Sequence, residues 1–246
     1  MLIVCSQIGG GYRFLTDFIH FSVIPGSPIA YWVSESFVKA FTAGKAVSHF
    51  ASPKQGMSTC DVNRFVKLWS EVDITRTNIF ERGNHSRWVT YNKGGECRKW
   101  YGNKDCVVLW NGNGDLLRQN NAALRNQDAY FLEFIAWTKL SSYNTGFRDF
   151  DSDNLFDGAG GSLFMFSKDN KKYFLGCLNS NVVAYILSVI SPTLNFNESH
   201  IGEIPIIIDD NCKSEVDRLV ADNIDVSSKD WDSFEVSWDF KRHPLI

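Results

Sequence analysis

The sequence predicts a mixed α/β (α+β) fold, in which a mixed or antiparallel sheet is followed by a helical C-terminal segment. Short apolar runs separated by turn residues, including an Asn-Gly pair, indicate the sheet. From about residue 172 onward, the apolar spacing becomes that of amphipathic helices. A chain of 246 residues is long enough to bury a substantial core.

The first predicted elements are a helix and a strand. Residues 28–44 have helical apolar spacing and end at Gly44, which is typical of a helix C-terminus. After a polar loop, side chains alternate in residues 64–72, with Phe65, Lys67 and Trp69 on one face. This period of two predicts a strand.

The middle of the chain predicts a small antiparallel sheet. Residues 97–102 and 106–110 are strand-like segments joined by three turn residues, which predicts a hairpin, and the turn at 111–114 reverses the chain again. Residues 130–140 and 162–166 are further apolar runs of strand character.

The C-terminal third predicts mainly helices. Residues 172–190 have helical apolar spacing, and residues 201–208 form an extended stretch. Residues 214–223 predict an acidic amphipathic helix, and a second helix is expected to begin at Ser227.

The composition excludes several classes of protein. Charged residues make up 22% of the chain and aromatic residues 14%, so it is not disordered, collagen-like or a coiled coil. The six cysteines are scattered without a Cys-x-x-Cys pair, which favours reduced thiols over a zinc site. The N-terminus lacks the basic region of a secretory signal, and polar residues interrupt the apolar stretch 173–190. We therefore expect a soluble, cytoplasmic protein with no membrane segment.

The charge is distributed unevenly along the chain. The formal net charge is −3, which argues against a protein that coats DNA indiscriminately. Residues 82–125, however, contain eight Lys or Arg and three acids, whereas residues 198–239 contain twelve acids and three Lys or Arg. One face can therefore attract a polyanion although the total charge is negative.

The sequence contains no recognisable catalytic motif. Its six prolines include no Pro-Pro pair, so the Asn/Asp-Pro-Pro-aromatic loop of adenine methyltransferases is absent. Gly9-Gly10-Gly11 begins a possible nucleotide or S-adenosylmethionine loop, but Phe14 replaces the third glycine. Walker, Gly-x-Ser-x-Gly and His-Glu-x-x-His motifs are missing, and the five histidines have no obvious catalytic partner. We expect no catalytic residue and no metal ligand.

Residues 93–103 interleave cations, aromatic residues and glycines. Glycine lets a backbone come close to a phosphate or a base, and Arg, Lys and Asn are typical DNA-contacting residues. A half-buried hairpin with its cations in solvent has the same pattern. From these residues alone, both interpretations stay open.

Four segments recur in the same order in one known family: IPGSPIAYWVSE (24–35), GMSTCDVNRFVKLWSEV (56–72), YNKGGECRKWYGN (91–103) and DWDSFEVSWDFKRHPL (230–245). They resemble the C-terminal half of the PglX family, the adenine-specific DNA methyltransferases of bacterial BREX phage-defence systems. Similar target recognition domains occur in single-chain restriction–modification enzymes of the TaqI type. Shorter resemblances lie at residues 161–166, 178–187, 191–196 and 201–206.

The resemblance implies a target recognition domain at residues 24–208, preceded by a lead-in (1–23) and followed by an acidic helical tail (209–246) that begins a spacer. In this family the N-terminal half carries the S-adenosylmethionine loop and the Asn-Pro-Pro-Tyr motif, and neither is present here. We therefore expect a fragment, from a truncated gene or an excised domain, that has no cofactor or activity of its own.

The function that the resemblance implies is to position double-stranded DNA for N6-adenine methylation by a catalytic domain, in the same chain or in another. Arg98 and Asn103 are expected to read bases, whereas Lys93 and Lys99 are expected to bind phosphates. The complete set of expected DNA-contacting residues is Arg64, Lys93, Arg98, Lys99, Tyr101, Asn103, Arg118, Thr138, Ser141 and Ser142.

Two alternatives stay open. The chain is one half of a split methyltransferase that is active only with a catalytic partner. Alternatively, it is a protein-interaction module, whose acidic helices from Glu198 onward dock other BREX components or a phage inhibitor that mimics DNA.

Overall fold

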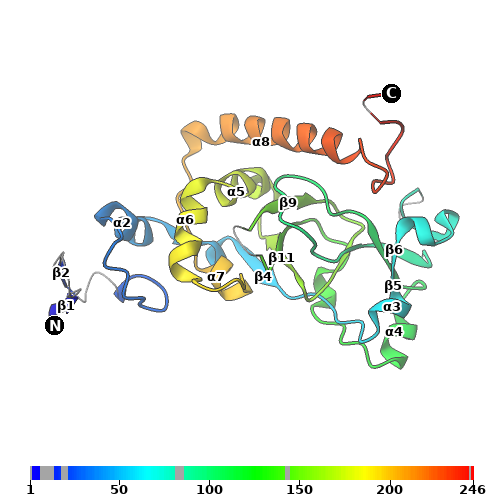
Figure 1. The fold of residues 1–246 in the computed structure, drawn as a ribbon, viewed down its shortest axis with the longest axis horizontal. Coiled ribbons are helices and arrows are strands. Elements are labelled where there is room, and N and C mark those ends of the chain that lie inside the picture. The colour runs from blue at the N-terminus through cyan, green and yellow to red at the C-terminus, as the bar shows by residue number, and fades with distance from the viewer. Residues whose placement is uncertain (1, 6–13, 18–21, 81–85, 142–144, 244) are drawn as a thin grey trace.

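The computed structural model describes residues 2–5, 14–17, 22–80, 86–141, 145–243 and 245–246. Within these residues, two four-stranded sheets and a set of helices form three layers, and two short pairs of strands lie outside them (Figure 1). The mixed α/β class predicted from the sequence is therefore confirmed.

The first sheet is antiparallel throughout and has the strand order β4-β11-β8-β9. The second sheet has the order β10-β6-β7-β5, in which β10 runs parallel to β6 and the other pairs are antiparallel. The strands of the two sheets are β4 (Ala51–Lys54), β5 (Val66–Leu68), β6 (Trp88–Asn92), β7 (Cys106–Leu109), β8 (Phe134–Thr138), β9 (Phe147–Phe150), β10 (Leu155–Phe156) and β11 (Gly160–Met165).

Strand β8 shows why the first sheet is the middle layer. All five of its residues are buried. Ile135 and Trp137 belong to the core shared with the helices, whereas Phe134 and Ala136 belong to the core shared with the second sheet. Because successive side chains of a strand point to opposite faces, both faces of this sheet are covered.

The core between the two sheets accounts for much of the aromatic content. Phe134 stacks on Phe150 with ring centroids 5.0 Å apart, and Phe156 and Phe164 pack against the same ring of Phe134. These aromatic contacts fix the second sheet against the first.

The helices are shorter or longer than the sequence predicts. They are α2 (Glu35–Ala43), α3 (Val62–Phe65), α4 (Asp115–Gln119), α5 (Lys171–Leu178), α6 (Asn181–Ile190), α7 (Glu198–Gly202) and α8 (Asp210–Trp231). Single 3-10 turns lie at Val47–His49, Trp69–Glu71, Ile74–Arg76, Gln127–Ala129 and Lys168–Asn170.

Two N-terminal predictions are wrong in their boundaries. The expected helix at 28–44 begins at Glu35, because the Ser34 side chain accepts a hydrogen bond from the Phe37 N–H and caps the helix there. Most of the expected strand at 64–72 is not strand. Asp61 caps the short helix α3, and β5 follows as only three residues before a 3-10 turn.

The predicted helix at 172–190 is two helices. Asn179 ends α5 and exchanges two hydrogen bonds with the backbone of Phe147, while the Ser180 side chain caps α6. The bend between the helices is 76°. No single described helix is long and apolar enough to span a membrane, although this bent pair passes that test by length and composition.

The acidic C-terminal region forms one helix instead of the two predicted. Helix α8 runs along the top of the molecule in Figure 1 and packs on α5. Its apolar face, with Val216, Val220 and Ile224, continues across the predicted break and joins the helical core. A Cβ at Gly176 of α5 would lie 2.9 Å from Val220 Cγ2, so the absence of a side chain there allows the close approach.

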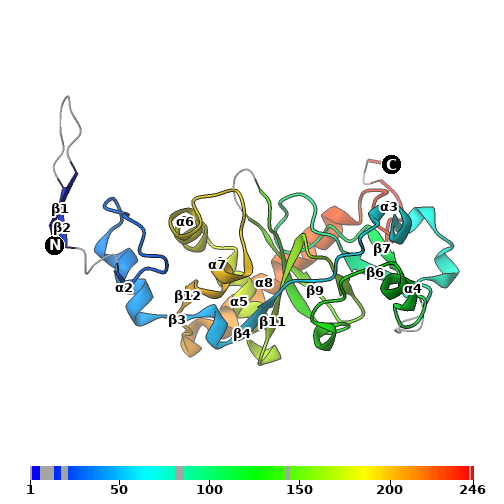
Figure 2. The same ribbon diagram turned by 90° about the horizontal axis from the view of Figure 1, so that it is seen from below.

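The N-terminal part lies at the opposite end from the second sheet (Figure 2). Strands β1 (Leu2–Cys5) and β2 (Phe14–Asp17) form an antiparallel pair there. After α2, β3 (Lys45–Ala46) pairs with β12 (Pro205–Ile206) and ties this part to the helical layer.

Candidate nucleic-acid interface

Residues 93–105 form a loop between β6 and β7, which we call the 93–105 loop. The predicted strand at 97–102 and its hairpin are therefore wrong. Trp100 and Asn103 have φ of 71° and 55°, and Gly102 has φ of 121°, which are left-handed conformations that a strand does not contain. Only Trp100 makes a bridge, to Arg148 of β9.

The buried guanidinium of Arg148 holds the 93–105 loop from inside. Arg148 is 0% exposed, and its Nη1 donates to the carbonyl oxygens of Glu96 and Arg98, each at 3.4 Å, and to Thr138 Oγ1 at 3.2 Å. Burial lowers its pKa to about 10. Arg148 is not among the residues predicted from the sequence, because an Arg in an apolar strand has no motif that marks it.

Two of the predicted DNA-contacting residues support the same loop. Asn103 is buried, and its Nδ2 donates to the carbonyl oxygens of Gly94 at 2.7 Å and Glu96 at 2.8 Å. Thr138 is also buried, and its hydroxyl donates to the same Glu96 oxygen at 3.3 Å. In this structure both side chains fix the shape of the loop from its interior.

Arg98 lies between the loop and the end of α8. Its Nη1 is 3.2 Å from Asp230 Oδ2, and its guanidinium lies 5.0 Å from the ring centroid of Trp231. One third of the side chain is exposed. The guanidinium thus has one ion-pair partner and one accessible edge.

Lys99 and Tyr101 also contact the helices. The Lys99 ammonium donates to the carbonyl oxygen of Asn179 at 2.8 Å, at the C-terminus of α5. Burial, together with the negative charges of nearby aspartates, raises the pKa of Tyr101 well above that of a free tyrosine.

Lys93 belongs to a second polar cluster, centred on Asp157. Oδ2 of this carboxylate accepts hydrogen bonds from the Lys93 ammonium and the Tyr91 hydroxyl, both at 2.7 Å. Burial and the Asp157 charge raise the pKa of Tyr91. Tyr91 therefore stays neutral and donates to the carboxylate.

We call one exposed region the α3–α4 surface. It consists of the segments that carry Arg64, Arg118 and Arg125, together with these three residues. An antiparallel bridge between Ser58 and Ala123 joins these segments. All three arginines are exposed, and neither Arg64 nor Arg125 makes an ion pair with any residue that the structure describes.

Arg118 is more constrained than the other two arginines. Its Nη1 lies 3.0 Å from Asp115 Oδ1, and Nη2 donates to Gln127 Oε1 at 2.9 Å. Since the pair with Asp115 is solvent-exposed, it contributes little stability and leaves the guanidinium accessible.

An open polar cavity of about 460 Å³ lies beside this surface. Ser58, Thr59, Lys93, Arg125 and Asp157 are among the residues that line it. Thr59 is 2% exposed, and its hydroxyl has no hydrogen-bond partner among the described residues. Such a group favours a ligand oxygen or an ordered water in the cavity.

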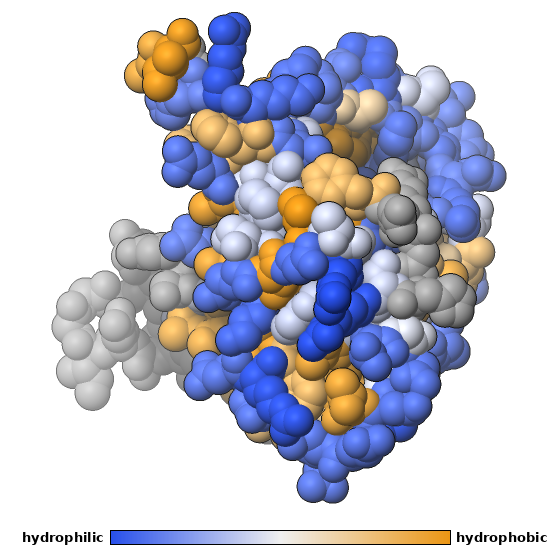
Figure 3. Space-filling view, turned by 90° about the vertical axis from the view of Figure 1, so that its right-hand side faces the viewer, coloured by the Kyte–Doolittle hydropathy of each residue, from blue (hydrophilic) through white to orange (hydrophobic). Residues whose placement is uncertain are grey.

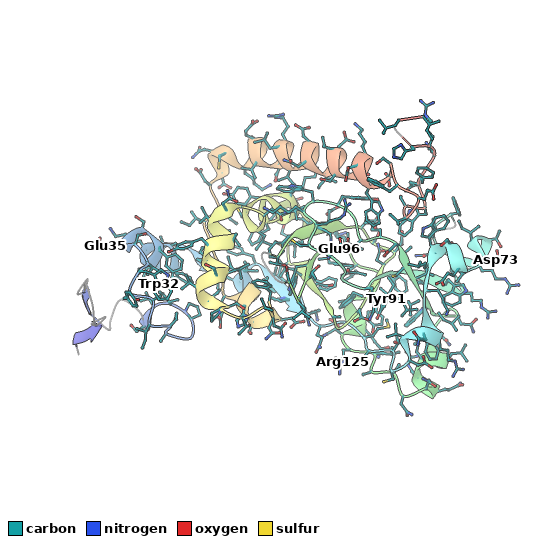
Figure 4. All side chains as sticks on the ribbon, viewed as in Figure 1. Trp32, Glu35, Asp73, Tyr91, Glu96 and Arg125 are labelled. Carbon is teal, nitrogen blue, oxygen red and sulfur yellow. The ribbon has the colours of Figure 1, made fainter. Side chains whose placement is uncertain are left out.

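Arg125 of the α3–α4 surface lies apart from Glu96 of the 93–105 loop in the view of Figure 4. Arg125 projects at the lower edge of Figure 4, whereas Glu96 lies towards α8, which runs along the top. Hydrophilic residues cover most of the end of the molecule that carries the second sheet, with small apolar patches between them (Figure 3). A polar surface of this kind is typical of nucleic-acid interfaces.

The structure thus divides the residues predicted from the sequence. Lys93 and Arg125 line the 460 Å³ cavity, and Arg64 and Arg118 are exposed on the α3–α4 surface. Arg125 belongs to the basic segment but is not among the residues predicted to contact DNA. The other residues of the 93–105 loop and Thr138 do not line this cavity. Ser141 donates its backbone N–H to Leu194, and Ser142 lies outside the described residues.

Comparison with known proteins places the chain beside adenine-specific methyltransferases. No protein-family model matches it. It is 36% identical to the adenine-specific methyltransferase BrxX of Escherichia coli O9:H4 (strain HS), over 92% of this chain and 18% of that protein. It is 30% identical to the adenine-specific methyltransferase PglX of Lacticaseibacillus casei (strain Zhang), over 96% of this chain and 20% of that protein. The chain spans about a fifth of the length of these curated relatives.

Proposed function

We propose that this chain is the DNA sequence-recognition module of an N6-adenine DNA methyltransferase in a BREX phage-defence system. The observation that carries the proposal is the α3–α4 surface, where three arginines are exposed and one of them, Arg125, lines an open polar cavity. Exposed arginines without a strong ion-pair partner suit phosphate binding, because the planar guanidinium donates to two phosphate oxygens at once. The similarity to BrxX and PglX supports DNA as the polyanion.

In this proposal Arg64, Arg118 and Arg125 contact phosphates, and Lys93, whose side chain lines the cavity and is 32% exposed, meets the edge of the duplex. The 93–105 loop is a preformed recognition element, because interior hydrogen bonds fix its shape before DNA binds. Preorganisation lowers the entropic cost of binding.

Methyl transfer is assigned to a catalytic domain outside this sequence, in the same chain or in another. S-adenosylmethionine sites of the doubly wound kind need a glycine-rich turn between a parallel strand and a helix. In the described residues, the Gly112–Gly114 turn joins β7 to α4, but β7 pairs antiparallel with both neighbours. These residues do not fit that cofactor, and we derive no methyl-transfer step from them.

The proposal is tested by selecting bound fragments from a library of randomised duplex DNA and sequencing them. Wild-type protein is expected to enrich one sequence. Arg125→Glu is expected to lose most of the bound DNA, whereas Lys172→Glu, which makes the same charge change at an exposed site on α5, is expected to retain the enrichment. Recovery of DNA without any sequence preference would contradict a recognition role.

One observation favours a second function, a docking module for a basic partner. The three basic residues of α8 all pair with acids of the same helix: Lys213 with Asp217, Arg218 with Glu215 and Asp222, and Lys229 with Asp225. The helix therefore keeps a net negative exposed face. Weak, salt-insensitive DNA binding would favour this second function.

A further inference from the structure

A second cavity, of about 270 Å³, lies where the C-terminal segment meets the edge of the second sheet. Tyr101, Lys104, Asp151, Trp238 and Asp239 are among the residues that line it. Sites for drug-sized ligands measure roughly 300–1,000 Å³, so this cavity is suited to one small group.

Lys104 is the unusual residue of this cavity. It is 6% exposed, and its ammonium lies 4.3 Å from the ring centroid of Tyr101 and 5.0 Å from that of Phe150. Among the described residues it makes neither an ion pair nor a hydrogen bond, and burial lowers its pKa. An ammonium group has three hydrogen-bond donors, and leaving them unpaired in the interior is costly. Lys104 therefore favours a ligand that brings acceptor atoms into the cavity.

The same cavity also contains carboxylates, which need hydrogen-bond donors from a ligand. Asp151 and Asp239 both line it together with Tyr101, and their charges add to the effect of burial in raising the pKa of Tyr101. Asp151 Oδ1 accepts from Asn154 Nδ2 at 2.6 Å, which leaves its second oxygen for a ligand. A matching ligand therefore has hydrogen-bond donors as well as acceptors.

Two further aromatic side chains line the cavity among mostly polar residues. Trp238 is half-buried and Phe80 is 66% exposed, and both line the cavity together with Tyr101. Aromatic side chains of this kind stack on planar rings, and proteins use them to hold nucleobases.

We propose that this cavity binds a guanine base. Guanine offers the O6 and N7 acceptors that Lys104 needs and the N1–H and 2-amino donors that the carboxylates need. Adenine keeps the N7 acceptor but carries an amino donor in place of O6 and has no N1–H or 2-amino donor, so it would match Lys104 and the carboxylates less completely. Lys241 and Arg242 are exposed, make no ion pair with a described residue and line a neighbouring pocket that shares Asp239, so they are placed to hold the attached phosphate.

The guanine can come from a free nucleotide or from a nucleotide turned out of a DNA strand. The second source rests on the proposed DNA-recognition function, whereas the first does not. The cavity would bind the guanine base from either source through the same contacts. The two sources are therefore distinguished by experiment.

The test is calorimetric titration of the whole chain with GMP, IMP and AMP. GMP is expected to bind at least about tenfold more tightly than IMP, which lacks the 2-amino group, or AMP. Lys104→Met and Asp239→Asn are each expected to weaken GMP binding by a similar factor, with Lys172→Met as the surface control. Asp239 is exposed, so its variant remains informative if Lys104→Met does not fold. Undetectable GMP binding at millimolar concentration, or equal affinities for GMP and AMP, would overturn the proposal.

Duplexes with one unpaired guanine or one unpaired adenine identify the source. Tighter binding of the guanine duplex, lost in Asp239→Asn, assigns the cavity to DNA. Equal binding of the two duplexes beside selective GMP binding assigns it to a free nucleotide. A fully paired duplex in the same assay reports on the proposed function, so failure of DNA recognition is distinguished from failure of the guanine site.

Discussion

Two arginines of adjoining segments, Arg98 and Arg148, have different environments and therefore different expected roles. Arg148 is fully buried and donates to carbonyl oxygens of the 93–105 loop, which is a structural role. Arg98 keeps a third of its side chain exposed and pairs with Asp230, which is itself 60% exposed. An exposed pair of this kind is worth little, so DNA can replace Asp230 as the partner of Arg98.

On the prediction that Arg98 reads a guanine, Arg98→Ala is expected to lower discrimination at one base pair by roughly 1–3 kcal/mol, because the bidentate contact would be lost. The measurement is the affinity of the variant for a cognate duplex and for duplexes with single substitutions. Asp230→Asn, which removes only the ion pair, serves as the control and is expected to leave discrimination unchanged. Unaltered discrimination in Arg98→Ala would assign Arg98 to packing against Trp231 instead.

At the scale of elements, the sequence predicts where buried strands lie better than it predicts boundaries that single residues set, such as the break at Asn179 in the predicted helix 172–190. The strand-like run at 130–140 contains β8, and the run at 162–166 covers all of β11 except its first two residues, because buried strands are rich in apolar and aromatic residues. The hairpin prediction fails at Trp100 and Asn103, whose left-handed conformations depend on tertiary contacts. Arg125 was missed because its exposure follows from the fold and not from a local pattern.

The shape of the 93–105 loop depends on Gly146. A Cβ at this position would lie 2.2 Å from the carbonyl oxygen of Arg98, which is backbone and cannot rotate away. Gly146→Ala is therefore expected to lower the free energy of unfolding by about 1–3 kcal/mol and to shift the loop. Urea denaturation measures this change. Gly158→Ala, whose Cβ meets no atom closer than 3.5 Å, is the matched control, and equal stability of the two variants would contradict the assigned contact.

At the scale of the whole molecule, stability is expected to fall at alkaline pH. Burial raises the pKa of Cys106 from 9.0 to about 12 and also raises the pKa values of Tyr91 and Tyr130. The folded state keeps these protons above pH 9–10, whereas the unfolded state releases them, so the free energy of unfolding decreases as pH rises.

Urea denaturation between pH 8 and 10.5 measures this decrease, which is at most about 1.4 kcal/mol per pH unit for each such group. Tyr91→Phe removes one of the groups and is expected to flatten the dependence near pH 10.5. Stability that stays constant or increases across this range would contradict the burial of these groups.

The net charge of −3 is a sum that includes two regions of opposite sign. These regions are the α3–α4 surface and α8. Under the proposed function, a polyanion is attracted to the α3–α4 surface and repelled by α8. The orientation of the chain on DNA is therefore expected to follow from charge alone, before any base is read.

The most direct measurement of the DNA-recognition proposal is the salt dependence of affinity for duplex DNA, by fluorescence anisotropy. The logarithm of the association constant is expected to fall linearly with the logarithm of salt concentration, with a slope of about −0.9 for each phosphate neutralised. Arg125→Ala is expected to reduce the steepness by about 0.9, and Lys172→Ala to leave it unchanged. A slope near zero for the wild type, or the same slope for Arg125→Ala, would contradict DNA binding through the α3–α4 surface.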